Sequence, residues 1–246
     1  MPDAKIAVFL HLYYVDLWPE FRNYLKNFKS IPFDLYINLV IDTWFPLVSE
    51  TILHDYPNAN IIISENRGQD IGGLLNMIRF ANLQKYENIC LAHDKKSLHA
   101  KNVDKWRNKL LDAIIGDHKT IQDNLRILND SNTGILGSNE WHFHCTDRHE
   151  KTLSGTNNSK LTELCEEMQI STNLNCKYIA GTIMWVKRPI LEILKQHEPF
   201  LAERMAYRVQ LNGGWEHAVE RIFGPIAKHL KLKSCGVPQI TGRIPD

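Results

Sequence analysis

The sequence predicts an α/β protein whose mostly parallel sheet is flanked by helices. The first reason is that short, continuous apolar runs alternate with stretches of helical periodicity through the first half of the chain. Uninterrupted apolar runs are typical of strands that are buried on both faces, as in parallel sheets. The second reason is composition, because 246 residues that are 43% hydrophobic and 23% charged can build one sizeable core. Since nothing marks a linker, we expect a single domain over residues 1–246.

Four strands are expected in the first half of the chain, at residues 5–13, 34–41, 60–64 and 88–92. Three helices are expected between them: one after Asp16, one over residues 44–56, and one from Ile71 with apolar residues at i, i+3, i+4 and i+7. This order implies parallel strands joined by crossover helices. Because parallel strands share one carboxyl edge, and ligands bind there, the loops after these strands are the candidate site.

The second half of the chain is less regular. We expect two helices from Val103, a short strand over residues 133–136, a helix over 160–168, a strand over 178–186 and a helix opened by Pro189. A last helix over residues 215–223 should end at Gly224-Pro225. Residues 140–158 are polar and have no clear period, so we interpret them as a long loop or lid.

Composition narrows the class of protein. Lysines and arginines number 29 against 28 acids, and this near-balance argues against a general nucleic-acid binder. The five cysteines are odd in number and form no Cys-x-x-Cys pair, which favours reduced thiols in a cytoplasmic protein. No apolar run approaches the ~18 residues of a membrane span, and no signal peptide is recognisable. We expect a cytoplasmic location, with peripheral attachment to the inner membrane left open.

The turn over residues 65–73 is the most informative segment, because it joins an apolar run to a helix start. Free backbone N–H groups and the helix dipole favour an anion at such a place. Asn66, Arg67, Gly68 and Asp70 are therefore candidates for binding a phosphate-bearing ligand. The turn has neither the Gly-x-Gly-x-x-Gly order after the first strand nor the Gly-Lys-Ser/Thr of a P-loop. In the alternative interpretation, Asp70 only caps the helix and Arg67 lies on the surface.

Two further loops follow strands at the same edge. His11 and Tyr13 come after the first strand, and His93, Asp94 and Lys95 come after the fourth. A lysine here could neutralise a diphosphate leaving group, and Asp94 could hold Mg²⁺ or Mn²⁺. A single carboxylate is thin support for a cation, so metal binding stays open. The alternative is a solvated turn.

The last helix and the late strand carry the remaining candidates. Glu216 and Glu220 share a helical face, and either carboxylate, or the His217 imidazole, could act as a general base. On spacing alone, a surface helix with a salt bridge to Arg221 is favoured. Gly181 and the adjacent Thr182 could allow close approach of a ligand, or could simply cross the core.

A histidine-rich segment around His142, His144 and Cys145 invites a zinc interpretation. Structural zinc needs four ligands at characteristic spacing, and no second ligand pair follows. We therefore do not expect a metal centre here, and favour an aromatic loop that packs over a sugar or base.

Taken in order, these motifs resemble the rhamnan synthesis protein F family. The similarity runs from about Ile6 to Gly224 and rests on residues 11–14, 65–72, 93–97, 181–185 and 217–224. It implies a glycosyltransferase-like protein of bacterial surface polysaccharide synthesis with a GT-A type nucleotide-sugar fold. It also makes His217 and Glu220 site candidates. Metal-using GT-A enzymes carry Asp-x-Asp where this chain has His93-Asp94-Lys95, so Lys95 is expected to neutralise charge in place of a metal.

The resemblance implies transfer of a sugar from a nucleotide-diphosphate donor to a hydroxyl of a glycan or lipid-linked glycan. Asn66, Arg67 and Asp70 would contact the nucleotide or its phosphates, and His93 and Lys95 the diphosphate. Glu216, His217 or Glu220 would deprotonate the acceptor if the anomeric centre is inverted. The alternative is a non-catalytic nucleotide-sugar or glycan-binding module. A phosphate-processing hydrolase is disfavoured because no Gly-x-Ser-x-Gly elbow is present.

Overall fold

The computed structural model describes residues 5–94, 103–130, 132–146, 154–207 and 213–238. Its main sheet has seven strands in the order β3-β2-β1-β4-β8-β5-β9. These strands are β1 (Ile6–Leu12), β2 (Asp34–Val40), β3 (Asn60–Ser64), β4 (Asn88–His93), β5 (Thr133–Ser138), β8 (Met184–Lys187) and β9 (Lys233–Val237). All neighbours pair in parallel except β8, which is antiparallel to both β4 and β5. The predicted α/β class with a mostly parallel sheet is confirmed.

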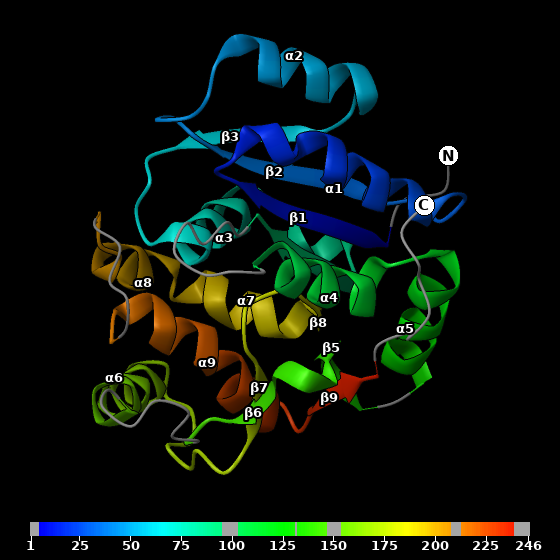
Figure 1. Cartoon of the computed structure of the whole chain (residues 1–246). Helices are drawn as coiled ribbons and strands as arrows, with labels where there is room; N and C mark the ends of the chain where they lie inside the picture. Colours follow the sequence, from blue (N-terminus) through cyan, green and yellow to red (C-terminus); the bar gives the residue numbers. More distant parts are fainter. Residues whose placement is uncertain (1–4, 95–102, 131, 147–153, 208–212, 239–246) are drawn as a thin grey trace.

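Helices cover both faces of this sheet (Figure 1). They are α1 (Trp18–Leu25), α2 (Pro46–Asp55), α3 (Gln69–Phe80), α4 (Val103–Ile115), α5 (His118–Asp130), α6 (Ser154–Glu167), α7 (Arg188–Gln196), α8 (Glu198–Arg204) and α9 (Trp215–His229). A second, two-stranded antiparallel sheet is formed by β6 (His142–His144) and β7 (Lys177–Ile179). Among the described residues, no helix has both the length and the apolar character that crossing a bilayer requires.

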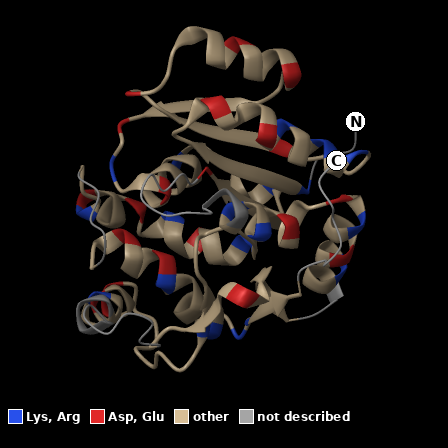
Figure 2. Ribbon diagram, viewed as in Figure 1, with Lys and Arg blue, Asp and Glu red and all other residues tan. Residues whose placement is uncertain are grey.

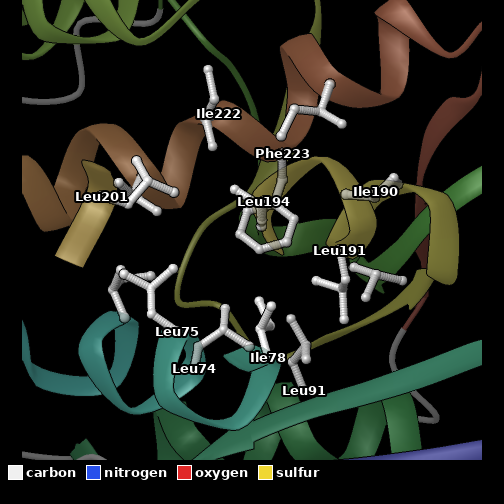
Figure 3. Packing of buried hydrophobic residues seen from close by; sticks show 14 of the residues in the cluster. Leu74, Leu75, Ile78, Leu91, Ile190, Leu191, Leu194, Leu201, Ile222 and Phe223 are labelled. Atoms are coloured by element: carbon white, nitrogen blue, oxygen red, sulfur yellow. The ribbon is translucent and has the colours of Figure 1, made fainter. Parts of the chain in front are cut away.

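The sheet separates two hydrophobic clusters, because successive strand residues point to opposite faces. In β1, Phe9 packs in the cluster that contains α3, α7 and α9, whereas Val8 and Leu10 pack in the cluster of α1, α2, α4 and α5. Figure 3 shows the first cluster, where leucine and isoleucine side chains from α3 and α7 meet Phe223 of α9. This packing fixes α3 and α9, which carry candidate site residues, against the same face of the sheet.

The strand predicted over residues 178–186 is wrong in one respect, because the run is broken. Residues 177–179 form β7 in the small sheet, and the main-sheet strand β8 begins only at Met184. Between them, Gly181 has φ +93° and Thr182 has φ +52°, a left-handed conformation that no strand contains. The apolar run reflects burial in both sheets, and burial alone does not distinguish one strand from two.

The helix predicted over residues 215–223 also needs correction, because α9 continues through Gly224-Pro225 to His229. A proline inside a helix cannot donate to the carbonyl four residues earlier, which here belongs to Arg221. The Cys145 Sγ lies 3.8 Å from that carbonyl oxygen and contacts it in place of the missing N–H. Tertiary contacts therefore carry the helix past its expected end.

The expected loop over residues 140–158 is partly structured. It contains the end of a 3-10 turn (Asn139–Trp141), the strand β6 and the start of α6 at Ser154, while residues 147–153 lie outside the described part. The helix predicted over residues 160–168 is thus the second part of a longer one. The short α8 and the edge strand β9 were not predicted.

Candidate functional site

The strand order places a topological switch point between β1 and β4. The chain passes from β1 to β2 and β3 on one side, and then returns to place β4 on the other side of β1. At such a point the loops leaving the two strands diverge and open a crevice at their carboxyl ends. His11 and His93 are direct register partners on these two strands. The candidate residues that follow these strands therefore lie at the edge where α/β proteins bind ligands.

Asp94 ties the two loops together. One carboxylate oxygen accepts a hydrogen bond from the Tyr13 backbone N–H at 3.0 Å, and the other accepts one from the Tyr14 N–H. The Asp94 backbone N–H donates in turn to the His11 carbonyl at 3.1 Å. Burial raises the pKa of the Asp94 carboxyl, although the nearby His11 and the two N–H donors act in the opposite direction. Asp94 thus holds the loop after β1 against the loop after β4.

His11 is buried beneath this link. Its Nδ1 lies 2.8 Å from the Oδ1 of Asn38 in β2, and the Asn38 amide nitrogen donates to Ser64 Oγ at 2.8 Å. Because the Asn38 oxygen faces the ring, Nδ1 of His11 carries the proton and donates. Burial lowers the pKa of His11 and favours this neutral form. Asn38 was not predicted as a site residue, although a lone amide within an apolar strand was the available signal.

His93 connects two helices that are distant in sequence. Its Nε2 lies 2.6 Å from the Gly181 carbonyl oxygen and 3.6 Å from Oδ2 of Asp70 on the first turn of α3. The backbone N–H of Gly181 donates to the Glu220 carboxylate on α9. A continuous chain of polar contacts therefore runs from α3 through the end of β4 to α9. The left-handed turn at Gly181 makes this possible, because it presents its carbonyl to one side chain and its N–H to another.

A small cavity lies inside this cluster. Its volume is about 10 Å³, and its polar lining comes from His11, Asp70, His93 and Thr182. A cavity of this size holds about one water molecule. The described residues consequently form a polar floor at this edge of the sheet, and residues 95–102 lie outside the described part. Lys95 is among those residues, so its predicted role at the diphosphate lies outside the described part of the chain.

Arg67 and Gly68 lie in the turn before α3, where they contact the segment that follows α8. The Arg67 guanidinium donates from Nε to the Met205 carbonyl at 2.7 Å and from Nη2 to the Glu203 carbonyl at 2.8 Å. The Gly68 N–H donates to the Ala206 carbonyl at 2.8 Å, and a Cβ at Gly68 would lie 2.6 Å from the Met205 sulfur. Asn66 is half-buried in the same turn. Two guanidinium nitrogens expected at a phosphate are therefore engaged with backbone carbonyls.

Glu216 and His217 lie in the first turn of α9, one turn before Glu220. Glu216 is only 6% exposed, and its Oε1 lies 3.6 Å from Nδ1 of His217. Neither of these two atoms has a hydrogen-bond partner in the described structure. The carboxylate folds back over Gly214, where a Cβ would lie 2.1 Å from Oε1. A buried carboxylate oxygen without a donor is costly, which favours a functional role for Glu216.

The Asp94 carboxylate is engaged with the backbone of the neighbouring loop. Both of its carboxylate oxygens accept backbone N–H bonds, and in the described ranges no three His, Cys, Asp or Glu side chains are grouped as metal ligands. The histidine-rich segment is also used internally, since His142 Nε2 lies 3.1 Å from Ser234 Oγ. Burial lowers the pKa of His142 to about 4. The nearby Trp141 packs edge-on against Trp106 and Phe143, with centroids 5.2 and 6.0 Å apart.

Fold and site together define an α/β protein with a hydrogen-bonded polar cluster at the carboxyl ends of two adjacent parallel strands. A family model gives a more particular identification: the chain belongs to the family described as rhamnan synthesis protein F, whose model matches residues 1–231. That description connects the family with polysaccharide synthesis.

The chain is also similar to two curated proteins, both described as "Uncharacterized protein WxcX", from two strains of Xanthomonas campestris pv. campestris, B100 and ATCC 33913. Each is 24% identical over 98% of this chain. The chain spans about a third of their length, 34% in both cases.

Proposed function

We propose that this chain is a GT-A-like glycosyltransferase unit. It would move a sugar from a nucleotide-diphosphate donor to a hydroxyl of a bacterial surface glycan. The observation that carries the proposal is the convergence of His11, Asp70, His93 and Asp94 at the switch point between β1 and β4. Family membership supports the substrate class. The hydrogen-bonded floor supplies a rigid polar surface on which a nucleotide sugar can be oriented.

Donor binding would use the first turn of α3 and the loop after β4. Asp70 lies in the first turn of α3, and a carboxylate at a helix N-terminus competes with a phosphate for the N–H groups there. We therefore assign Asp70 to hydroxyl groups of the ribose or the sugar, which can donate to it. The diphosphate would lie nearer Lys95, whose cation stabilises the charge that develops on the leaving group.

In the transfer step, a base removes the acceptor proton while the acceptor oxygen bonds to the anomeric carbon. The bond from that carbon to the diphosphate oxygen breaks, and the nucleoside diphosphate leaves with the electron pair. One carboxylate oxygen of Glu220 accepts a hydrogen bond from the Gly181 N–H, whereas Glu216 has a buried oxygen for which the described part of the chain offers no donor. Glu216 is therefore the favoured base, with His217 beside it and Glu220 as the residue that positions the Gly181 turn. A direct displacement assisted by such a base would invert the anomeric carbon.

A direct test begins with binding. A panel of nucleoside diphosphates and nucleotide sugars is screened by thermal shift, and the best ligand is measured by calorimetry. Arg67→Ala and Asp70→Asn are compared with the exposed control Glu50→Gln. We expect weaker donor binding for Asp70→Asn and wild-type binding for the control. If no member of the panel raises the melting temperature, the nucleotide-sugar proposal is wrong.

Turnover separates the base from the positioning residue. Release of nucleoside diphosphate is measured with membrane-derived glycan as acceptor. Glu216→Gln should lower this rate by about 10²-fold or more while donor affinity stays within a few-fold. Wild-type turnover in Glu216→Gln would move the base role to another residue. No step is assigned to a divalent cation, so a chelator should leave transfer intact, and loss restored by Mn²⁺ would overturn that assignment.

A second candidate function is a non-catalytic nucleotide-sugar or glycan-binding module. The observation that favours it is that carboxylates of the cluster are used internally: Asp94 by two backbone N–H groups and Glu220 by a third. Carboxylates that are used in this way hold the binding surface rigid but take no part in a reaction. Donor binding with no release of nucleoside diphosphate, in wild-type protein and in Glu216→Gln alike, would establish this alternative.

A further inference from the structure

Two cysteines face each other at the end of the small sheet. His144 of β6 pairs with Lys177 of β7, so the next residues along, Cys145 and Cys176, are opposite one another. The Cys145 N–H donates to the Cys176 carbonyl at 2.9 Å, and the two Sγ atoms are 3.5 Å apart. Hydrogen-bonded partners in antiparallel strands have Cα atoms about 5.5 Å apart, which is within the range that a disulfide spans. A bond requires the sulfurs to approach by only about 1.5 Å.

The two thiols differ in their surroundings. Cys145 is fully buried, whereas Cys176 is half-buried and is the one that a reagent can reach. The close contact between the two sulfurs raises the pKa of Cys145 and lowers that of Cys176. Thiolates, not thiols, attack disulfides. Cys176 is thus suited to react first and Cys145 to resolve the product.

The other three cysteines do not share this arrangement. Cys90 is buried in β4, and burial raises its pKa. Cys165 is buried in α6, where burial raises its pKa to about 12. Cys235 is half-buried in β9, with its sulfur 3.5 Å from Thr133 Oγ1. Cys235 therefore offers a control of similar exposure without a facing thiol.

We propose that Cys145 and Cys176 are a redox modification site. A low-molecular-weight disulfide such as oxidised glutathione would convert these two facing thiols into a protein disulfide. The Cys176 thiolate attacks one sulfur of glutathione disulfide, forms a mixed disulfide and expels one glutathione thiolate. Cys145, after losing its proton, attacks the Cys176 sulfur and expels the second glutathione. Two protein thiols are oxidised and one glutathione disulfide is reduced to two glutathiones. This proposal does not depend on the transferase function.

The two cysteines lie next to the part of α9 that carries Glu220, so a disulfide between them would change the surroundings of the candidate site. Cys145 Sγ contacts the Arg221 carbonyl that Pro225 leaves without a backbone donor, and the Arg221 guanidinium donates to the Cys145 carbonyl at 3.3 Å. Moving the Cys145 sulfur toward Cys176 draws it away from this part of α9, directly after Glu220. In addition, β7 leads within two residues to Gly181, which donates to Glu220.

The test uses the native full chain incubated with oxidised glutathione and then analysed by intact mass and peptide mapping. We expect the mass to fall by two hydrogens, with no glutathione retained and with the peptides of Cys145 and Cys176 joined. Cys145→Ser should retain one glutathione on Cys176, because the substitution removes the thiol that faces the mixed disulfide. Cys235→Ser should behave as the wild type does.

Three results would overturn the proposal. They are retention of glutathione by the wild type, a crosslink between Cys176 and Cys165 instead of Cys145, and formation of the same crosslink at an equal rate in denaturant. The wild-type measurement decides the matter even where a serine variant does not fold.

Discussion

Replacing Gly73 with alanine should destabilise the protein, although alanine is the better helix former. Gly73 lies in the interior of α3, where that helix crosses the end of β1. A Cβ at this position would lie 2.1 Å from Nδ1 of His11 and 2.7 Å from Oδ1 of Asn38. Neither group can easily yield, because His11 is held by Asn38, and Asn38 by Ser64.

The magnitude follows from two opposing effects. Alanine is more favourable than glycine in a helix interior by about 1 kcal/mol. Forcing an extra carbon into a packed core costs about 1–3 kcal/mol, and contacts this short belong at the upper end of that range. We therefore expect a net loss of about 1–2 kcal/mol in the free energy of unfolding. For a chain of this size, the melting temperature should fall by about 2–8 °C.

Urea unfolding of Gly73→Ala, His11→Ala and the double variant measures the effect and its cause. Without the His11 ring, the substitution at Gly73 should be neutral or stabilising, so the two changes should couple by about 1–3 kcal/mol. The m-value should stay unchanged, since only the native packing is altered. If Gly73→Ala had no effect on stability, either with His11 present or in the His11→Ala variant, α3 would not pack as closely against His11 as the structure shows.

The remaining predictions concern the same region. Gly181→Ala should cost about 1–3 kcal/mol in urea unfolding, because φ is +93° and the new Cβ would lie 2.9 Å from Trp106; an unchanged midpoint would contradict the left-handed turn. The lowered pKa of His11 means that its contribution to stability is present above about pH 6.5 and is lost as the pH falls toward the folded-state pKa. The stability advantage of wild type over His11→Gln should therefore shrink between about pH 7 and pH 5, and a constant difference would place His11 in solvent. Arg67→Met should cost about 1–2 kcal/mol and speed hydrogen exchange at residues 203–206, since two charged hydrogen bonds to that segment are lost; unaltered exchange would leave the guanidinium available for a phosphate.

The amino-acid composition predicts the overall charge of the protein but not which charged side chains form pairs. The chain has 29 basic and 28 acidic residues. Figure 2 shows that both signs are interspersed over the described part of the chain. Which charges are paired is decided by packing. Arg79 on α3, for example, forms a two-nitrogen contact with the buried Glu198 at 2.6 and 3.0 Å, although 119 residues separate them.

Several site residues could be placed from the sequence because position in a strand–loop–helix unit is local information. His11 and His93 lie near the carboxyl ends of the apolar strands β1 and β4, Asp94 follows β4, and Asp70 lies in the first turn of a helix with clear periodicity. Parallel order then requires these residues to share one edge of the sheet. The 3.6 Å approach of His93 to Asp70 shows that two of these loops meet.

The roles of other residues could not be predicted from the sequence, because these residues contact partners that are far away along the chain. Nothing near Arg67 indicates that its guanidinium binds the carbonyls of Glu203 and Met205. The break at Gly181 depends on β7 joining a second sheet, and the continuation of α9 depends on Cys145 at the Arg221 carbonyl. A short apolar run has the same strand propensity whether it forms one strand or two, and a Gly-Pro pair disfavours a helix whether or not the helix continues. Tertiary contacts therefore decide between these outcomes.

The sequence by itself determined the α/β class, the strand-then-helix order of the first half and the edge of the sheet where polar loops gather, because hydrophobic periodicity records burial residue by residue. Only the tertiary structure decided which polar groups are satisfied internally and which are left for a ligand. Asp94 and Glu220 accept hydrogen bonds from backbone N–H groups, whereas one buried oxygen of Glu216 has no donor among the described residues. The physical reason is that a hydrogen bond depends on the distance between two groups in space, and folding sets that distance between segments that the chain order leaves far apart.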